Sequence, residues 1–265
     1  MVFSPLGPGM ELVWDIVAMV ISILAVMLVV LINGAIQKGG KLSSDVTRKI
    51  VHIFAGPVFL VTWPLYTGGL LSRVIAAVVP ILFVLLFVGI GTGKVKNEAF
   101  VASMSRSGKP EELLKGTLYY AIWIVIITLL WFYVPPAGLA SASPLALIII
   151  GCVAGGDGMA DIVGRKYGGE RKFGIGGAQK TVAGSFGMLI GSLVFCSALV
   201  LIFSLEAGFS LIAMFPVILI ISIVATLVEA LSPSSLDNWT VPISVVIVAA
   251  VLSSVTMWSF PLLTL

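Results

Sequence analysis

The chain has 265 residues, of which 59% are hydrophobic and only 10% charged, and its mean hydropathy is +1.18. Soluble domains carry about a quarter charged residues, so this composition excludes a soluble globular fold. The formal net charge is +3, and no nucleic acid is expected among the partners.

Long apolar runs predict an all-α integral membrane protein with about eight transmembrane helices in a single polytopic domain, residues 1–265. The second run is short and contains Pro57 and Pro64, and the fifth is purely apolar only from Leu145 to Ala154. The N-terminus lacks the basic region of a signal peptide, so we expect the first helix to be retained. The expected spans are Leu12–Ile36, Ile50–Tyr66, Leu70–Ile90, Thr117–Val134, Pro144–Val163, Val182–Leu205, Phe209–Leu231 and Val241–Leu262.

The basic residues gather on one side of this arrangement. All of the 15 lysines and arginines except Arg73 fall in the connections that precede the second, fourth and sixth helices. Because positive charge is retained on the cytoplasmic side, we expect both termini on the non-cytoplasmic side. Nine of the 12 acidic residues share the cytoplasmic face. The active site is therefore expected to face the cytoplasm, in a bacterial inner membrane or an organelle envelope.

Two carboxylates follow the purely apolar part of the fifth run, in the segment GGDGMADIVGRKYGG. Asp157 and Asp161 are four residues apart, which places them on one face of a helix and suits one or two Mg²⁺ ions that bridge to phosphates. Ionised groups at membrane depth are costly and are usually functional. We expect both to bind metal and to act in catalysis, with Arg165 and Lys166 as nearby cations.

The start of the sixth helix offers an anion site made of Lys180, Thr181, Gly184 and Ser185. Backbone N–H groups and the helix dipole favour phosphate at such a terminus. Gln179 precedes the Lys-Thr pair where the P-loop spacing requires glycine, so a P-loop kinase is disfavoured. Gly187 and Gly191 form a GxxxG pair and are expected to pack against another helix.

Arg48 and His52 lie four residues apart in the motif RKIVH, at the cytoplasmic entry of the second helix. His52 is the only histidine, and a catalytic or phosphate-contacting role and a local interfacial role are both open for it. The mixed-charge segment 104–120, taken alone, predicts a solvated surface helix that binds anionic headgroups. Cys152 and Cys196 lie inside apolar runs, and no chemistry is assigned to them.

A last polar group surrounds the connection between the seventh and eighth helices. Glu229 ends a long apolar run, where solvation alone does not explain a carboxylate. Asp237 and Asn238 follow within the same connection. Asn238 or Thr240 ahead of Pro242 fits a helix N-cap with proline in the first turn, and capping is a sufficient role for them.

Five of these segments, in this order, resemble the phytol kinase family, which is related to dolichol kinases and more distantly to CTP:phosphatidate cytidylyltransferases. No single motif is sufficient, but together they cover the cytosolic half of nearly the whole chain. The segments are RKIVH (48–52), MSRSGKPEELLKGTLYY (104–120), GGDGMADIVGRKYG (155–168), KTVAGS (180–185), and Glu229 with DNWTVP (237–242).

The resemblance implies transfer of the γ-phosphoryl group of a nucleotide, typically CTP, to a membrane isoprenoid alcohol such as phytol, with Mg²⁺ and within a lipid membrane. Asp157 and Asp161 would hold the metal–triphosphate, and one of them or Glu229 would accept the hydroxyl proton, with His52 a further catalytic candidate. The expected nucleotide-binding residues are Arg48, Arg165, Lys166, Lys180, Thr181, Gly184, Ser185, Asp237 and Asn238.

Two alternatives remain open at this point. A cytidylyltransferase would use the same triphosphate site with attack at the α-phosphate, but that family carries an acidic residue where this chain has Ala183. An ion-coupled transporter would use the intramembrane acids as a relay. The clustering of the acids on one face and the absence of an evident inverted repeat favour the kinase.

Overall fold

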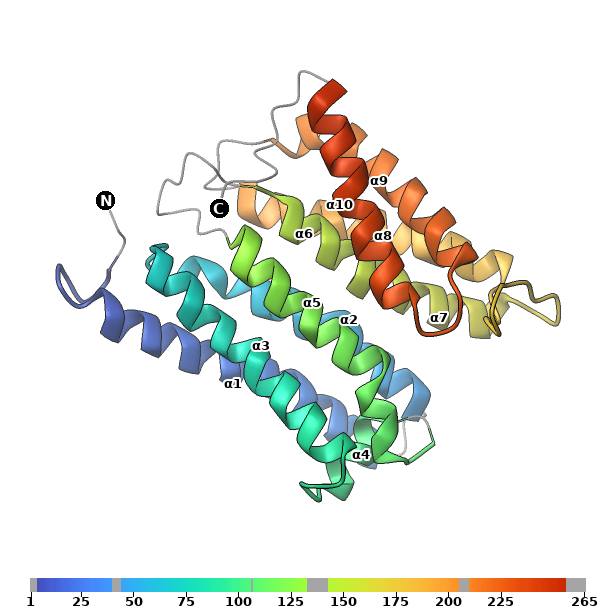
Figure 1. Ribbon diagram of the computed structural model, residues 1–265, viewed down its shortest axis with the longest axis horizontal. Coiled ribbons are helices and arrows are strands. Elements are labelled where there is room, and N and C mark those ends of the chain that lie inside the picture. Colours follow the sequence, from blue (N-terminus) through green and yellow to red (C-terminus); the bar gives the residue numbers. More distant parts are fainter. Residues whose placement is uncertain (1–3, 40–43, 106, 133–142, 205–209, 256–265) are drawn as a thin grey trace. The chain divides into compact units, whose positions relative to one another are not determined.

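The computed structural model describes residues 4–39, 44–105, 107–132, 143–204 and 210–255, which form helices and no strand (Figure 1). The chain divides into two compact units, residues 2–129 and residues 130–265. Within the described ranges, seven helical stretches are long and apolar enough to cross a membrane. The chain is therefore an all-α, multi-pass membrane protein, as predicted, while the side on which the termini lie stays a prediction.

The described residues of the first unit form five α-helices, of which α1, α3 and α5 begin within a residue of an expected apolar run. Two 3-10 segments, Trp63–Leu65 and Pro110–Leu114, join them. The α-helices are α1 (Glu11–Lys38), α2 (Ser44–Val61), α3 (Leu70–Gly91), α4 (Glu98–Met104) and α5 (Gly116–Trp131).

The second expected span, Ile50–Tyr66, differs most from the structure. Helix α2 begins six residues earlier and ends at Val61, and Pro64 lies in the following 3-10 turn. The first two turns of α2 are charged, and the helix is not among the seven apolar spans. Hydropathy marks the apolar part of a helix, so it missed the polar turns at its start.

The segment 104–120 is not the solvated surface helix that its charge pattern predicted. Leu113 is fully buried, and the Ser105 hydroxyl donates a hydrogen bond to Glu112 at 2.7 Å. The segment takes part in an apolar core, because its buried leucine packs there with residues of the five α-helices of this unit. That core comprises Val30, Val51, Phe87, Ile90, Phe100, Val101, Met104, Leu113 and Ala121.

The second unit holds the remaining helices. Its first span is continuously helical from Leu145 to Tyr167, although the type of helix changes along it. A π-helical segment, Gly151–Gly156, separates α6 (Leu145–Ile150) from α7 (Asp157–Tyr167). The other helices are α8 (Val182–Ser204), α9 (Leu211–Leu231) and α10 (Asp237–Val255).

Glycines let the π-helical segment and α7 lie directly against α8. A Cβ atom added at Gly187 would lie 2.7 Å from the Met159 carbonyl oxygen, and one added at Gly191 would lie 2.5 Å from the Gly155 carbonyl oxygen. Such contacts with backbone leave no room for a side chain. The predicted packing role of Gly187 and Gly191 is confirmed, and their contacts lie on either side of Asp157, at Gly155 and Met159.

Candidate active site

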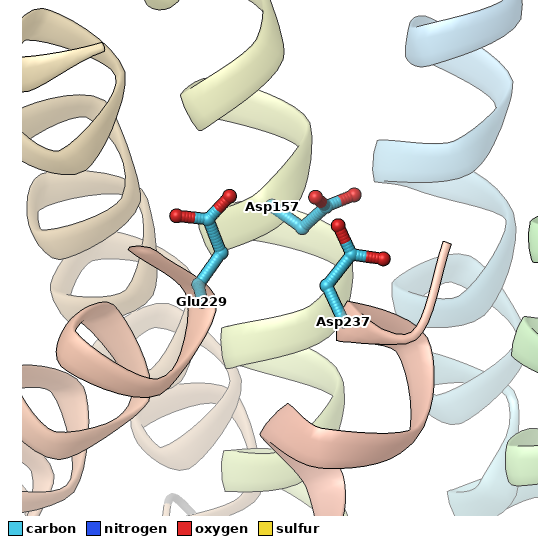
Figure 2. A group of neighbouring side chains, drawn as sticks. All are labelled: Asp157, Glu229 and Asp237. Atoms are coloured by element: carbon cyan, nitrogen blue, oxygen red, sulfur yellow. The ribbon is translucent and has the colours of Figure 1, made fainter. Parts of the chain in front are cut away.

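Three carboxylates meet in the second unit. Asp157 begins α7, Glu229 lies in the last turn of α9, and Asp237 begins α10. One oxygen of each lies within 4.8 Å of the other two, and Figure 2 shows the side chains converging from their separate helices. We call these three residues the carboxylate triad. Like charges so close repel, so the triad requires a cation.

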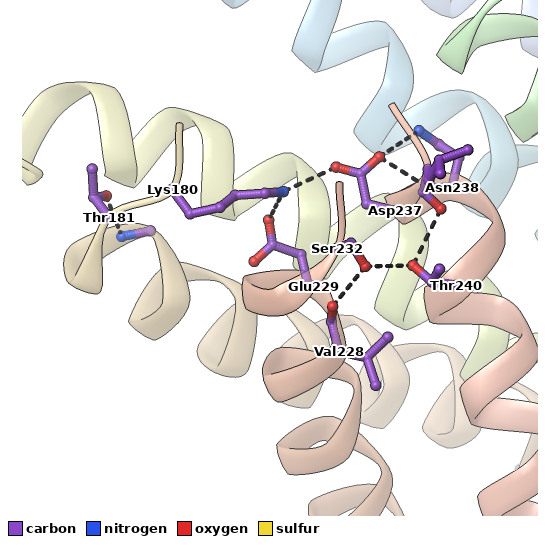
Figure 3. A network of polar contacts seen from close by, with 10 residues as sticks. Lys180, Thr181, Val228, Glu229, Ser232, Asp237, Asn238 and Thr240 are labelled. Carbon is purple, nitrogen blue, oxygen red and sulfur yellow. Dashed lines mark hydrogen bonds and ion pairs between the residues drawn. The ribbon is translucent and has the colours of Figure 1, made fainter. Parts of the chain in front are cut away.

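Lys180 supplies one positive charge from the connection between α7 and α8. Its Nζ donates hydrogen bonds to Glu229 and, at 2.9 Å, to Asp237 Oδ2 (Figure 3). Burial alone would lower the pKa of Lys180, but the Asp237 and Glu229 carboxylates outweigh burial and hold that pKa above its usual range. The ammonium therefore stays charged, and it balances one of the three negative charges of the triad.

Hydroxyl groups link the connection between α9 and α10 to both helices. The hydroxyl of Ser232 donates to the Val228 carbonyl oxygen at 2.6 Å and lies 2.5 Å from the hydroxyl of Thr240 (Figure 3). The N-cap prediction for Asn238 or Thr240 is wrong, because α10 already begins at Asp237 and contains both. Asp237 Oδ1 instead accepts the backbone N–H of Asn238 at 3.0 Å.

Asp161, the expected partner of Asp157, is not a member of the triad. It accepts a hydrogen bond from Arg165 Nε at 2.8 Å, in an ion pair one turn along α7. Lys166 lies over the ring of Tyr167, 5.2 Å from its centroid. The spacing argument identified two acids on one helix, whereas the structure combines the first of them with acids from two other helices.

The expected anion site at the start of α8 has an internal cap. The Thr181 hydroxyl accepts the N–H of Gly184 at 3.0 Å, and the Thr181 carbonyl accepts the N–H of Ser185 at 3.0 Å. The side chain of Thr181 thus engages an amide that the prediction assigned to phosphate. A phosphate-binding role for Thr181, Gly184 and Ser185 stays a prediction.

Arg48 and His52 belong to the first unit. The imidazole of His52 lies against the ring of Tyr120, with 4.4 Å between the ring centroids. This contact places His52 between α2 and α5, consistent with a local packing role. Catalysis by His52 and nucleotide binding by Arg48 remain predictions, as do the phosphate contacts of Arg165 and Lys166.

The triad has the donor set of a divalent-cation site. Magnesium takes oxygen ligands, and usually combines one or two carboxylates with water and substrate phosphates. With Lys180 included, the four charged side chains carry a net charge of about −2, which a divalent cation would neutralise. The structure already places one cation, the Lys180 ammonium, against two of the three carboxylates. The residues present therefore suit a metal that is bound together with phosphate.

No family model matches the chain, and no solved structure matches it significantly. Curated plant proteins do match. A rice protein named probable phytol kinase 2, chloroplastic, is 38% identical over 215 residues, which are 79% of this chain and 66% of the rice protein. Arabidopsis phytol kinase 1 is 31% identical over 225 residues, covering 81% of this chain and 69% of its own length.

Arabidopsis farnesol kinase is 36% identical over 208 residues, covering 77% of this chain and 63% of its own length. These plant relatives are longer than the present chain, which spans about two thirds of each. The similarity extends over most of this chain rather than over one motif. The chain therefore belongs to the phytol kinase family.

Proposed function

We propose that this chain is a kinase that transfers the γ-phosphoryl group of a nucleoside triphosphate, CTP in the first place, to the hydroxyl of a membrane isoprenoid alcohol. The observation that carries the proposal is the carboxylate triad with Lys180, in a chain whose relatives are named as phytol and farnesol kinases. Phytol and farnesol differ in chain length but share a terminal hydroxyl on an isoprenoid tail. The common acceptor chemistry is a primary allylic alcohol held at the membrane surface.

In the proposed reaction, the alcohol oxygen forms a bond to the γ-phosphorus while the bond between that phosphorus and the β-phosphate oxygen breaks. The products are an alkyl monophosphate and a nucleoside diphosphate. A carboxylate of the triad accepts the hydroxyl proton, and Lys180 holds phosphate oxygens. Mg²⁺, held by Asp157, Glu229 and Asp237, would neutralise charge on the triphosphate. Alignment and charge neutralisation are the main requirements of phosphoryl transfer.

The location of the triad supports a site that opens to the cytoplasm. Glu229, Asp237 and Lys180 lie at helix ends or in connections on the side where the basic residues gather. Side-specific labelling tests this placement. A cysteine introduced at the exposed Glu170 should react with a membrane-impermeant maleimide in inverted vesicles and not in right-side-out vesicles. The reverse pattern would place the site on the other side.

Labelled CTP tests the reaction itself. Detergent-purified protein is incubated with Mg²⁺ and CTP labelled at either the α or the γ position, with phytol, geranylgeraniol, farnesol, polyprenol or phosphatidate as acceptor. We expect γ label alone to enter a lipid monophosphate, and EDTA to abolish transfer. Label from the α position with release of pyrophosphate would instead establish a cytidylyltransferase. ATP, GTP and UTP in the same assay rank the donors.

A further inference from the structure

Lys180 forms ion pairs with two of the three carboxylates that would hold a metal. Its Nζ contacts Glu229 and Asp237, whose side chains are 4% and 15% exposed. The ammonium and a divalent cation would therefore compete for the same oxygen atoms. A metal that takes all three carboxylates as ligands would displace Lys180 from its partners.

The backbone of Lys180 is fixed although its side chain is long. Phe173 and Lys180 form an antiparallel bridge, with N–H to carbonyl distances of 2.9 and 2.8 Å in the two directions. The loop closed by this bridge contacts the connection between α9 and α10, since a Cβ atom added at Gly176 would lie 2.9 Å from Pro233. Movement of the ammonium therefore requires rotation about side-chain bonds only, and the loop would keep its place.

A displaced ammonium needs a new anion, because an unpaired charge at a partly buried position is costly. Metal alone brings none. A nucleotide that binds together with the metal brings a chain of phosphate oxygens, which a lysine binds as a point charge. We propose that Lys180 couples the binding of the two ligands. Its ammonium competes with metal for the triad when metal binds alone, and it moves to a phosphate oxygen when metal and nucleotide bind together. This inference rests on the proposed function in that the anion is a nucleotide phosphate.

Coupling of this kind is reciprocal, so nucleotide raises the affinity for metal by the same factor by which metal raises the affinity for nucleotide. Removal of the competing charge has a specific signature. Without Lys180, metal alone should bind more tightly, and nucleotide should add less. A lysine that only stabilised the fold would give the opposite result for metal alone, because its loss would loosen the triad.

The test measures binding of Mn²⁺ to the detergent-purified chain from the electron paramagnetic resonance signal of free Mn²⁺, with and without β,γ-methylene CTP. A protein-free titration corrects for Mn²⁺ held by the analogue. For Lys180→Met we expect about 10-fold tighter binding of Mn²⁺ alone, within the usual range of coupling factors, and little further gain from the analogue. Lys180→Arg keeps the charge and should behave as the unmodified chain does. Lys172→Met removes an exposed cation from the same connection between α7 and α8 and is the matched control.

Binding of Mn²⁺ alone that is unchanged or weaker in a folded Lys180→Met variant would overturn the inference. If that variant does not fold, Lys180→Gln replaces it, because the amide still donates hydrogen bonds to the two carboxylates, and the same gain is expected. The transfer assay with the unmodified chain separates this inference from the proposed function. A gain in Mn²⁺ affinity in Lys180→Met, without phosphoryl transfer by the unmodified chain, would support the competition and refute the proposed kinase function. Phosphoryl transfer without the gain in affinity would support the kinase function and refute the competition.

Discussion

Each compact unit of this chain buries carboxylate groups among apolar helices, but the partners of these carboxylates differ between the units. In the first unit, Asp15 is 2% exposed and accepts hydrogen bonds from the Thr67 N–H at 2.8 Å, the Thr67 hydroxyl at 2.9 Å and the Ser72 hydroxyl at 2.5 Å. All of these donors are neutral and lie in one short stretch of chain. In the second unit, three carboxylates lie close together, and Lys180 forms ion pairs with two of them.

The comparison shows that a buried acid in an apolar helix does not by itself indicate function. Asp15 joins α1 to the start of α3, and its oxygens already have donors, so its role is structural. The triad has more negative charge than its internal cation balances, so it favours a further cation. The balance of donors and charges around a buried acid therefore separates a structural role from a ligand-binding one.

The largest expected effect is on catalysis, from Asp157→Asn. Loss of one preorganised charge at a reacting centre typically lowers kcat by about 100- to 1,000-fold, and we expect a loss of that size. The melting temperature should not fall, because the substitution removes repulsion within the triad. Phosphoryl transfer and thermal unfolding in detergent measure the two quantities. Glu170→Gln, an exposed acid-to-amide change on the following connection, should leave both unchanged. Equal activity of Asp157→Asn and Glu170→Gln would contradict the functional role of the triad.

Asp15→Asn should give the opposite pattern. The new amide group would face hydroxyl donors with a donor of its own, and hydrogen bonds to a charged group are worth about 1.5–3 kcal/mol each, so we expect a loss of stability of about that size. The kcat per folded molecule should stay the same. A guanidine-free assay, such as thermal unfolding in detergent followed by tryptophan fluorescence, measures the loss. A fall in kcat without a fall in melting temperature would assign Asp15 to function after all.

Gly191→Ala tests how tightly α8 supports the triad. The added methyl group would meet the Gly155 carbonyl oxygen, and overpacking of this kind typically costs about 1–3 kcal/mol. Because Gly155 lies two residues before Asp157, activity should fall together with stability. Gly34→Ala is the control, since a Cβ atom there would have nothing within 4 Å. Equal melting temperatures of the two variants would contradict the close approach of α8 to the π-helical segment.

A smaller effect is expected for Asp161→Asn. Its ion pair with Arg165 is half exposed on the arginine side, and exposed pairs one helical turn apart contribute about 0.3–0.5 kcal/mol. The melting temperature should therefore change little, and kcat should fall much less than in Asp157→Asn. A loss of kcat as large as that of Asp157→Asn would restore the original pairing of the two aspartates.

The smallest effect concerns pH. The folded state raises the pKa of Lys180, so the stabilisation from its ion pairs is fully present below the usual lysine value of 10.5 and is lost only as the pH rises beyond it. Between about pH 7 and 9, the difference in melting temperature between the unmodified chain and Lys180→Met should stay constant. A difference that shrinks within this window would show that the lysine loses its proton earlier.

The helices were predictable because the bilayer sets the length of an apolar run. The run Val182–Leu205 and α8, Val182–Ser204, differ by a single residue at the end. The start of α2 was not predictable in this way, because charged residues form its first turns and hydropathy does not detect them.

The three triad residues and Lys180 were each among the residues expected to act, but their grouping was not predicted. Asp157, Glu229, Asp237 and Lys180 were each expected to act, whereas their approach to one another depends on the packing of separate helices. Spacing along one helix reports only on neighbours such as Asp161. The structural role of Asp15 was not predicted, because its hydrogen-bond partners lie more than fifty residues away in the sequence.

The order in which the ribosome delivers the site has its own consequence. Asp157 and Lys180 emerge before the other two residues, Glu229 follows in the last turn of α9, and Asp237 begins α10, the final described helix. A nascent chain that has not yet inserted α10 holds only two of these acids beside the lysine, a net charge of about −1 instead of −2. The third carboxylate arrives only with α10, so a chain in the membrane that lacks α10 would bind a divalent cation more weakly.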